Sequence, residues 1–340
     1  METSRAKKYS TALLLGLAAL VCFGTPVLAE GMVQESYLYN LSDFSGRLPY
    51  NWPALAVDRA RGETFLVYQN EVVVFNESGM EVFRFGDGMD LGHVLAVAAG
   101  PGEEMLLLVY RDSKPSILRC NYRGEPVGEV VLSGLPEKYA GFAPNRMLYQ
   151  GGRIYLASQT GMQIVIAEAD GTFMKGFDLF ELFGLQDKRK GEVEFAGFRL
   201  DQEGNMLFTI PILFKANILS PDGSLKSFGK PGGAPGRFNI LGGMVADRQG
   251  NYLVADKLKS AIIVFDKDLK FIKEFGYRGD KPSNLIVPED LAIDEKDRIY
   301  VSQGRNRGVS VFRLTYDDRS TGGETPGKQS QNNKGGKRAG

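Results

Sequence analysis

The 340-residue chain contains few of the residues on which several common kinds of site depend. Its single histidine excludes any zinc site that uses two or more histidine ligands. Its two cysteines are too few for a disulfide framework or a four-thiolate zinc site. Lysine plus arginine equals aspartate plus glutamate at 41 each, so there is no excess charge for binding nucleic acid or anionic lipid by bulk electrostatics.

Long hydrophobic runs are also missing, except near the start of the chain. Residues 11–23 form an uncharged, mostly apolar run of 13 residues that follows three basic residues. As a helix this run is about 20 Å long, which is too short to span a bilayer core of about 30 Å. Small residues at 27–29 suit a signal peptidase. The pattern predicts that residues 1–29 are a cleaved signal peptide and that the protein is exported, to the periplasm or outside the cell.

Removal of the signal peptide leaves a nearly neutral chain with 40 acidic and 38 basic residues. Cys120 is then the only cysteine, so an intrachain disulfide is impossible, and a lone cysteine on a strand is typical of inert packing. No other uncharged apolar run approaches the length of about 18 residues needed for a membrane span. Residues 319–340 are polar, rich in glycine and without apolar periodicity, which predicts a disordered tail. We therefore expect one folded domain over residues 30–318.

A repeat of about 48 residues organises this domain. Six segments share one order: a short apolar strand that ends in aspartate or an equivalent residue, a turn that contains glycine, a second apolar strand, a polar loop and a third strand. The equivalent positions are Asp58, Ala98, Tyr149, Asp201, Asp247 and Asp294, which lie 40, 51, 52, 46 and 47 residues apart. Four of them are aspartates that open a turn, where the side chain can bond the backbone two residues on, so we expect a structural role rather than catalysis.

Each repeat is predicted to be a four-stranded antiparallel meander, because a second hairpin signal, such as Asp-Gly or Ser-Gly, joins strands three and four. Six such units arranged radially form an all-β, six-bladed β-propeller. The last repeat has only three clear strands, and residues 36–41 form a spare strand before the first repeat. We expect this strand to complete the sixth blade and close the ring. Deletion of residues 32–46 should then abolish soluble expression, because it exposes an unpaired sheet edge.

Residues 229–279 carry the phrase Arg-Phe, an apolar strand with aspartate, Gly-Asn, Tyr-Leu-Val-Ala-Asp and a strand that ends in Val-Phe. This segment resembles the NHL repeat, and the resemblance is good at 288–314, moderate at 52–86 and weak in the other three repeats. It implies a six-bladed propeller. It does not imply one activity, because members of this family serve as interaction surfaces, sensor domains, lyases and lactonase-like hydrolases.

Propeller ligands usually bind at one end of the central channel, so the innermost strands supply the candidate site. Alternation along these strands predicts three polar side chains in the channel: Asn145, Arg199 and Asp290. Four further candidates lie where the innermost strands begin: Trp52, His93, Phe195 and Glu289. Loops that open at the same end add three cations: Lys257, Arg305 and Arg307. A basic rim of this kind suits an anionic sugar, a phosphate, a polyanion or an acidic protein.

Each candidate also has a structural interpretation. The basic residues can be solvated loop tips, and a lone histidine in a loop is more often neither a base nor a metal ligand. Arg199 and Asp290 can pair with each other, or each can hold a ligand group.

Two functions remain open at this point. The first is a non-catalytic, monomeric recognition module with no cofactor that binds a protein partner or a small anionic ligand at the channel mouth, since the sequence offers no nucleophile–base pair. The second is a lactonase- or lyase-like propeller enzyme in which Glu289, Asp290, Asn145 and Asp256 hold calcium, because a hard cation prefers oxygen ligands. The absence of several histidines argues against a lyase, and no Cys-x-x-Cys-His motif is present for covalent haem.

Overall fold

The computed structural model describes residues 33–185 and 191–316. The predicted signal peptide and the predicted polar tail lie outside these residues. Within the described residues no helix is long and apolar enough to cross a bilayer. Regular structure in these residues is almost entirely β. The short helix α1 (Leu179–Leu182) directly follows the last strand of the third repeat.

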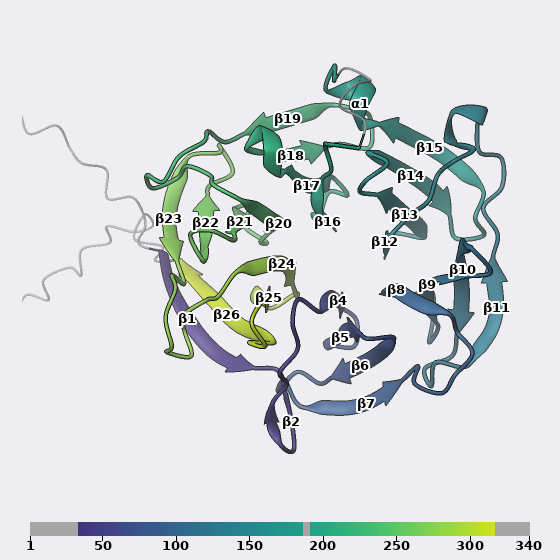
Figure 1. Cartoon of the computed structure of the whole chain (residues 1–340), viewed down its shortest axis with the longest axis horizontal. Coiled ribbons are helices and arrows are strands. Elements are labelled where there is room, and N and C mark those ends of the chain that lie inside the picture. The colour runs from purple at the N-terminus through teal and green to yellow at the C-terminus, as the bar shows by residue number, and fades with distance from the viewer. Residues whose placement is uncertain (1–32, 186–190, 317–340) are drawn as a thin grey trace, which may run out of the picture. The chain divides into compact units, whose positions relative to one another are not determined.

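Six four-stranded antiparallel sheets are arranged around a common centre, as Figure 1 shows. The all-β, six-bladed propeller predicted from the repeats is therefore confirmed. From the innermost strand outwards, the first three blades are β4 (Ala54–Asp58), β5 (Glu63–Tyr68), β6 (Glu71–Phe75) and β7 (Glu81–Phe85); β8 (His93–Ala99), β9 (Met105–Arg111), β10 (Lys114–Cys120) and β11 (Pro126–Val130); and β12 (Arg146–Gln150), β13 (Arg153–Ser158), β14 (Gln163–Glu168) and β15 (Phe173–Asp178).

The other three blades follow the same order along the chain. They are β16 (Ala196–Leu200), β17 (Met206–Ile210), β18 (Lys215–Leu219) and β19 (Leu225–Phe228); β20 (Leu241–Ala246), β21 (Tyr252–Asp256), β22 (Ala261–Phe265) and β23 (Phe271–Phe275); and β24 (Pro288–Ile293), β25 (Arg298–Gln303), β26 (Val309–Tyr316) and β1 (Val33–Asn40). A small hairpin, β2 (Ser42–Asp43) and β3 (Gly46–Arg47), and two 3-10 turns, Glu137–Tyr139 and Pro211–Leu213, lie outside the blades.

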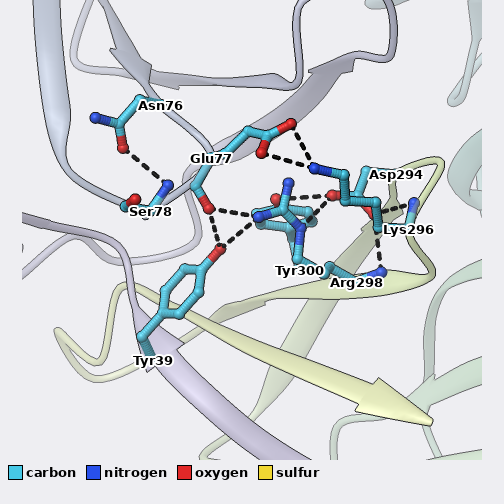
Figure 2. A network of polar contacts seen from close by, with 8 residues as sticks. All are labelled: Tyr39, Asn76, Glu77, Ser78, Asp294, Lys296, Arg298 and Tyr300. Atoms are coloured by element: carbon cyan, nitrogen blue, oxygen red, sulfur yellow. Dashed lines mark hydrogen bonds and ion pairs between the residues drawn. The ribbon is translucent and has the colours of Figure 1, made fainter. Parts of the chain in front are cut away.

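The N-terminal strand closes the ring as predicted. β1 pairs antiparallel with β26 and becomes the outer strand of blade 6 (Figure 1). Figure 2 shows the polar network that locks this closure to blade 1. The buried Arg298 side chain donates to Asp294 at 2.5 Å, to the Tyr39 hydroxyl at 3.2 Å and to the carbonyl oxygen of Glu77. The guanidinium therefore joins β1, blade 6 and the β6–β7 turn of blade 1.

The hydrophobic core is divided between the six junctions of neighbouring blades. Each of six buried clusters takes its side chains from two adjacent blades, such as Phe195 and Phe208 with Ile164 at the junction of blades 3 and 4. Cys120 is one of these buried residues, and burial raises the pKa of its thiol to about 11, so it stays protonated at neutral pH. The expectation that Cys120 packs as an inert side chain agrees with this environment.

Glycine allows the innermost strands of blades 4, 5 and 6 to approach closely. Gly197 has φ +65°, and a Cβ atom there would lie 2.5 Å from the Cα atom of Gly243. A Cβ atom on Gly243 would in turn lie 2.6 Å from a carboxylate oxygen of Asp290. The pairing register also shifts within these three strands. The channel is therefore narrowed and irregular on this side.

The aspartates that open the first hairpin of four blades bond to the turn that follows, as predicted. Asp58 accepts from the backbone N–H of Ala60 at 2.9 Å, and Asp294 accepts from that of Lys296 at 2.9 Å. Asp247 and Asp201 do the same for Gln249 and Asn205, at 2.9 and 2.8 Å. All four aspartates are buried, with exposed fractions of 2 to 5%. Their role is to fix the turns.

Candidate functional site

The channel has two ends, which we call the amino end, where the innermost strand of each blade begins, and the carboxyl end, where it finishes. A cavity of about 650 Å³ lies at the carboxyl end. All six blades line it, from Leu55–Arg61 of blade 1 to Ala292–Ile293 and Glu295 of blade 6. Its volume lies within the range of about 300 to 1,000 Å³ that is typical of small-molecule sites.

The wall of this cavity is mainly apolar and its rim is polar. Apolar side chains of the innermost strands form the wall: Val57, Val97, Leu148, Leu200 and Ile293. The rim carries Arg59, Arg61, Gln150, Gln202 and Glu295. Arg61 pairs with Asp58 at 2.7 Å and donates to the carbonyl oxygen of Gly102 at 2.9 Å, so its guanidinium is held against the turns of blades 1 and 2.

Arg199 forms the inner boundary of the cavity. Its guanidinium pairs with Asp290 at 2.7 Å and donates to the carbonyl oxygens of Leu291 at 2.6 Å, Leu55 at 3.2 Å and Phe198 at 2.8 Å. It thus connects blades 1, 4 and 6 across the channel. Of the two alternatives that the sequence left open for Arg199 and Asp290, the structure shows the ion pair. These four bonds use four of the five guanidinium N–H groups, which leaves one on Nη1 without an acceptor among the described residues.

The sequence interpretation missed Arg146, which lies in the same channel. Arg146, Arg199 and Asp290 together line a small space of about 10 Å³, enough for one water molecule. Arg146 donates to the carbonyl oxygen of Asn145 at 3.0 Å and has no ion pair among the described residues. Burial lowers the pKa of Arg146. Two cations thus share one carboxylate, and the channel behind the cavity carries a positive charge.

The side chain of the neighbouring residue Asn145 makes structural contacts within the protein. Its side chain donates to the Gln159 side chain at 3.1 Å and accepts from the Gln159 backbone at 3.1 Å. Gln159 in turn donates to the carbonyl oxygen of Phe195 at 3.0 Å. Asn145 therefore braces blade 3 against blade 4. A charged side chain within an inner strand was the signal that should have drawn attention to Arg146 instead.

Phe195 requires a correction. The sequence places it at the rim of the amino end, but its side chain is only 1% exposed. Its ring packs against that of Phe208 with centroids 5.3 Å apart, in the core between blades 3 and 4. Phe195 does lie directly before an innermost strand, as expected. Its side chain packs into the core between the two blades because burial of an apolar ring is more favourable in free energy than its exposure to water.

Six other predicted residues do lie at the amino end, where they take part in separate contacts. Lys257 pairs with Glu289 at 2.5 Å, and His93 contacts the Asn70 side chain. The indole of Trp52 donates to the carbonyl oxygen of Val287 at 3.1 Å. Arg307 donates to two carbonyl oxygens, and Arg305 is exposed without an ion pair in the described part of the chain. Of the ten predicted residues, only Arg199 lines the large cavity.

The oxygen donors proposed for calcium are engaged elsewhere. Asp290 pairs with Arg199, and Glu289 pairs with Lys257. Asp256 is fully buried and accepts from the backbone N–H groups of Asn239, Leu258 and Lys259 at 2.7, 3.1 and 2.9 Å. Residues 33–185 and 191–316 contain no group of three or more histidine, cysteine, aspartate or glutamate side chains placed to hold a metal ion.

Comparison with known proteins shows the fold. No protein-family model matches the chain, and no curated protein matches its sequence. Solved structures with similar folds include virginiamycin B lyase from Staphylococcus aureus, at 13% identity and TM-score 0.54 over 84% of this chain and 99% of the lyase. A gluconolactonase from Xanthomonas campestris matches at 13% identity and TM-score 0.53 over 83% of this chain and 90% of its own. The calcium-binding protein regucalcin from Agrobacterium tumefaciens matches at 16% identity and TM-score 0.53, over 83% of this chain and 98% of its own.

Proposed function

We propose that this protein is an exported, non-catalytic recognition propeller, of the NHL type suggested by residues 229–279, that binds a small anionic ligand in the cavity at the carboxyl end. The single observation that supports this is a cavity of about 650 Å³ that combines apolar side chains in its wall with the Arg199 guanidinium at its inner boundary. An apolar wall with a few placed polar groups is typical of small-molecule sites. The ligand class that fits is an apolar body with one acidic group.

The charges of the cavity support an acidic ligand. Three arginines, Arg59, Arg61 and Arg199, line it against two carboxylates, Asp58 and Glu295. Behind Arg199, the charges of Arg146 and Asp290 offset each other, so the cavity and the channel together carry a net charge of about +1. A carboxylate that accepts from the remaining Arg199 N–H forms a charge-assisted hydrogen bond, which is stronger than one between neutral groups. Because the inner-strand side chains of the wall are apolar and the charged groups lie at the rim and the inner boundary, the apolar body sets the fit and the acid sets the orientation.

A cavity-filling variant tests this proposal. Octanoate and phenylbutyrate should raise the melting temperature of the protein, while the matched octanol and phenylbutyramide should not. Ala99→Trp places a large ring in the cavity wall and should abolish the shift. Val127→Trp is the matched control, because Val127 lies on the outer strand of the same blade and is 56% exposed. An equal rise in melting temperature for both variants, or for the acids and the neutral compounds alike, would contradict an acid-binding cavity.

The alternative is a metal-dependent lactonase or lyase, the class suggested by the names of the gluconolactonase and lyase structures. It requires oxygen donors that are free to meet an ion, whereas Asp290 and Glu289 are held by cations. We expect calorimetric titration of the metal-stripped protein with calcium chloride to show no stoichiometric binding. Saturable binding that is lost in Asp290→Asn would favour the enzyme, and lactone substrates would then be the next measurement.

A further inference from the structure

The loops of blades 5 and 6 at the amino end of the channel form one braced surface. We call it the blade 5–6 surface and define it as loops 229–240, 257–260, 276–287 and 304–308 together with Trp52. Lys259 joins the first two loops through a bond to the carbonyl oxygen of Ala234 at 2.9 Å, and its ion pair with Glu274 at 2.5 Å anchors both to β23. A surface held in this way needs little ordering when a partner binds.

The two halves of this surface are also bonded to each other. Arg307 donates to the carbonyl oxygen of Asn284 at 3.0 Å, which ties the blade 6 turn to loop 276–287. The backbone N–H of Val287 donates to the Ser260 hydroxyl at 3.4 Å, and the carbonyl oxygen of Val287 accepts from Trp52. The surface is therefore continuous from loop 229–240 to the start of blade 1.

Four large apolar side chains are exposed on the blade 5–6 surface. They are Leu258, Tyr277, Trp52 and Ile240, at 66, 52, 48 and 47% exposure. Single exposed apolar residues are ordinary, but several on one surface mark an interaction site. Tryptophan and tyrosine are also the residue types that contribute most at the centre of protein interfaces.

Unpaired cations accompany these apolar residues. Six basic side chains of the surface have no ion pair among the described residues: Lys230, Arg237, Arg278, Lys281, Arg305 and Arg307. The corresponding unpaired acid in these loops is Asp280, because Glu274 and Glu289 are neutralised by Lys259 and Lys257. The net neutrality of the chain therefore conceals a local positive charge of about five.

The rest of the same end carries charges of both signs, which limits the kind of partner. The described loops at the amino end of blades 1 to 4 expose Asp87, Asp90, Asp112, Glu192 and Glu194 together with the cations Lys114 and Lys138. A flat anionic bilayer that contacts this end would meet those acids as well as the cations of blades 5 and 6. A compact partner with its own acidic and apolar surface meets only the cations, so the charges favour a protein over a lipid surface.

We propose that the blade 5–6 surface is a docking site for an acidic protein partner that covers Leu258 and Tyr277 and places carboxylates opposite Lys281 and Arg305. This inference does not depend on the small-ligand proposal, because the cavity opens at the other end of the channel. Apolar contacts at the centre supply affinity, and the surrounding cations supply orientation and association rate.

The probe is a random-peptide phage library panned against the folded protein with the cavity filled by octanoate. Peptides that combine acidic residues with aromatic or leucine residues should be enriched. Their affinity should fall about ten-fold in Leu258→Ser, the size of effect expected for a central contact. The matched control Val127→Ser, on the exposed outer strand of blade 2, should bind them like the wild type.

Charge reversal provides a second readout. Lys281→Glu with Arg305→Glu should slow association and remove most of its salt dependence, whereas Lys226→Glu on the outer strand of blade 4 should not. Enriched peptides without an acidic bias, or equal binding to Leu258→Ser and wild type, would overturn the proposal. Sedimentation of the wild-type protein with vesicles of phosphatidylglycerol and phosphatidylcholine, lost on the same charge reversal, would replace it with a lipid-docking surface.

Discussion

The four turn aspartates perform one structural role in different electrostatic environments. Asp58 and Asp294 face Arg61 and Arg298, at 2.7 and 2.5 Å. Asp201 instead accepts from the neutral backbone and side-chain N–H groups of Asn205, both at 2.8 Å. Burial raises the pKa of Asp201, because no cation compensates for the loss of water. The same turn therefore costs more free energy at blade 4 than at blades 1 and 6.

Asp201→Asn should raise the free energy of unfolding at neutral pH by about 1 kcal/mol, on the scale of one hydrogen bond. The amide keeps an acceptor for the backbone N–H of Asn205 and has no charge to bury. The sign follows from proton binding: a carboxyl group whose pKa is raised on folding holds its proton more tightly in the folded state. The Asp201 carboxyl group therefore stabilises the wild-type fold below its ordinary pKa of 3.8, and this stabilisation is lost as pH rises through the raised pKa. The free energy of unfolding of the variant should not fall over this pH range.

Urea unfolding at several pH values measures this difference. Asp294→Asn is the control, because it occupies the equivalent turn but leaves Arg298 buried without its carboxylate. It should lower the free energy of unfolding by about 3 kcal/mol. A neutral-pH loss of similar size in both variants would show that the negative charge of Asp201 stabilises its turn.

At the scale of strands, ring closure depends on β1 and on the network in Figure 2. Arg298 is 6% exposed and joins three segments, while Lys296 makes an exposed ion pair with Glu77 at 2.7 Å in the same network. Exposed pairs contribute at most about 1 kcal/mol, whereas removal of one member of a buried pair costs about 3 to 5 kcal/mol.

Arg298→Met should therefore lower the free energy of unfolding by about 3 kcal/mol, and Lys296→Met by less than about 1 kcal/mol. Urea denaturation followed by tryptophan fluorescence measures both, since Trp52 precedes blade 1 and bonds to Val287 of blade 6, so that its environment depends on the junction of these blades. If closure rests on main-chain pairing of β1 and β26 alone, the two variants will be equally stable.

The strands themselves were predictable, because each blade repeats the same turn signals. Hairpin signals such as Asp-Gly predicted where the strands end. Because the last repeat has only three strands, an additional strand, β1, was needed to complete its blade. The orientation of inner-strand side chains was less predictable. The register shifts between Ala196 and Arg199 and between Pro288 and Asp290, so simple alternation does not hold there. The placement of Arg199 and Asp290 in the channel was predicted, but Arg146 was missed and Phe195 was assigned to the wrong environment.

At the scale of the whole molecule, the two ends of the channel could not be ranked from the sequence. A count of loop cations favoured the amino end, but Lys257, Lys259 and Arg307 there bond to neighbouring protein groups. The carboxyl end has a large cavity because its inner strands carry small and medium apolar residues whose packing only the assembled ring defines. Convergence of six strands, rather than any local motif, creates this space.

The same convergence places Arg146 and Arg199 in one channel with a single carboxylate, and this predicts opposite effects of removing each cation. Arg199→Met removes four bonds and leaves Asp290 without its closest partner, so the free energy of unfolding should fall by about 3 kcal/mol. Arg146 has one hydrogen bond, and burial lowers its pKa, which means that its charged form is disfavoured in the folded protein.

Arg146→Met should therefore leave stability unchanged or raise it by about 1 kcal/mol, while weakening the binding of octanoate because the channel loses a positive charge. Urea unfolding and the octanoate melting shift measure the two effects on the same sample, and Arg146→Lys, which keeps the charge, should retain octanoate binding. A large loss of stability in Arg146→Met would show instead that Asp290 is shared equally between the two arginines. Gain of stability with loss of binding is the pattern expected of a charge that the ring holds for a ligand rather than for its own folding.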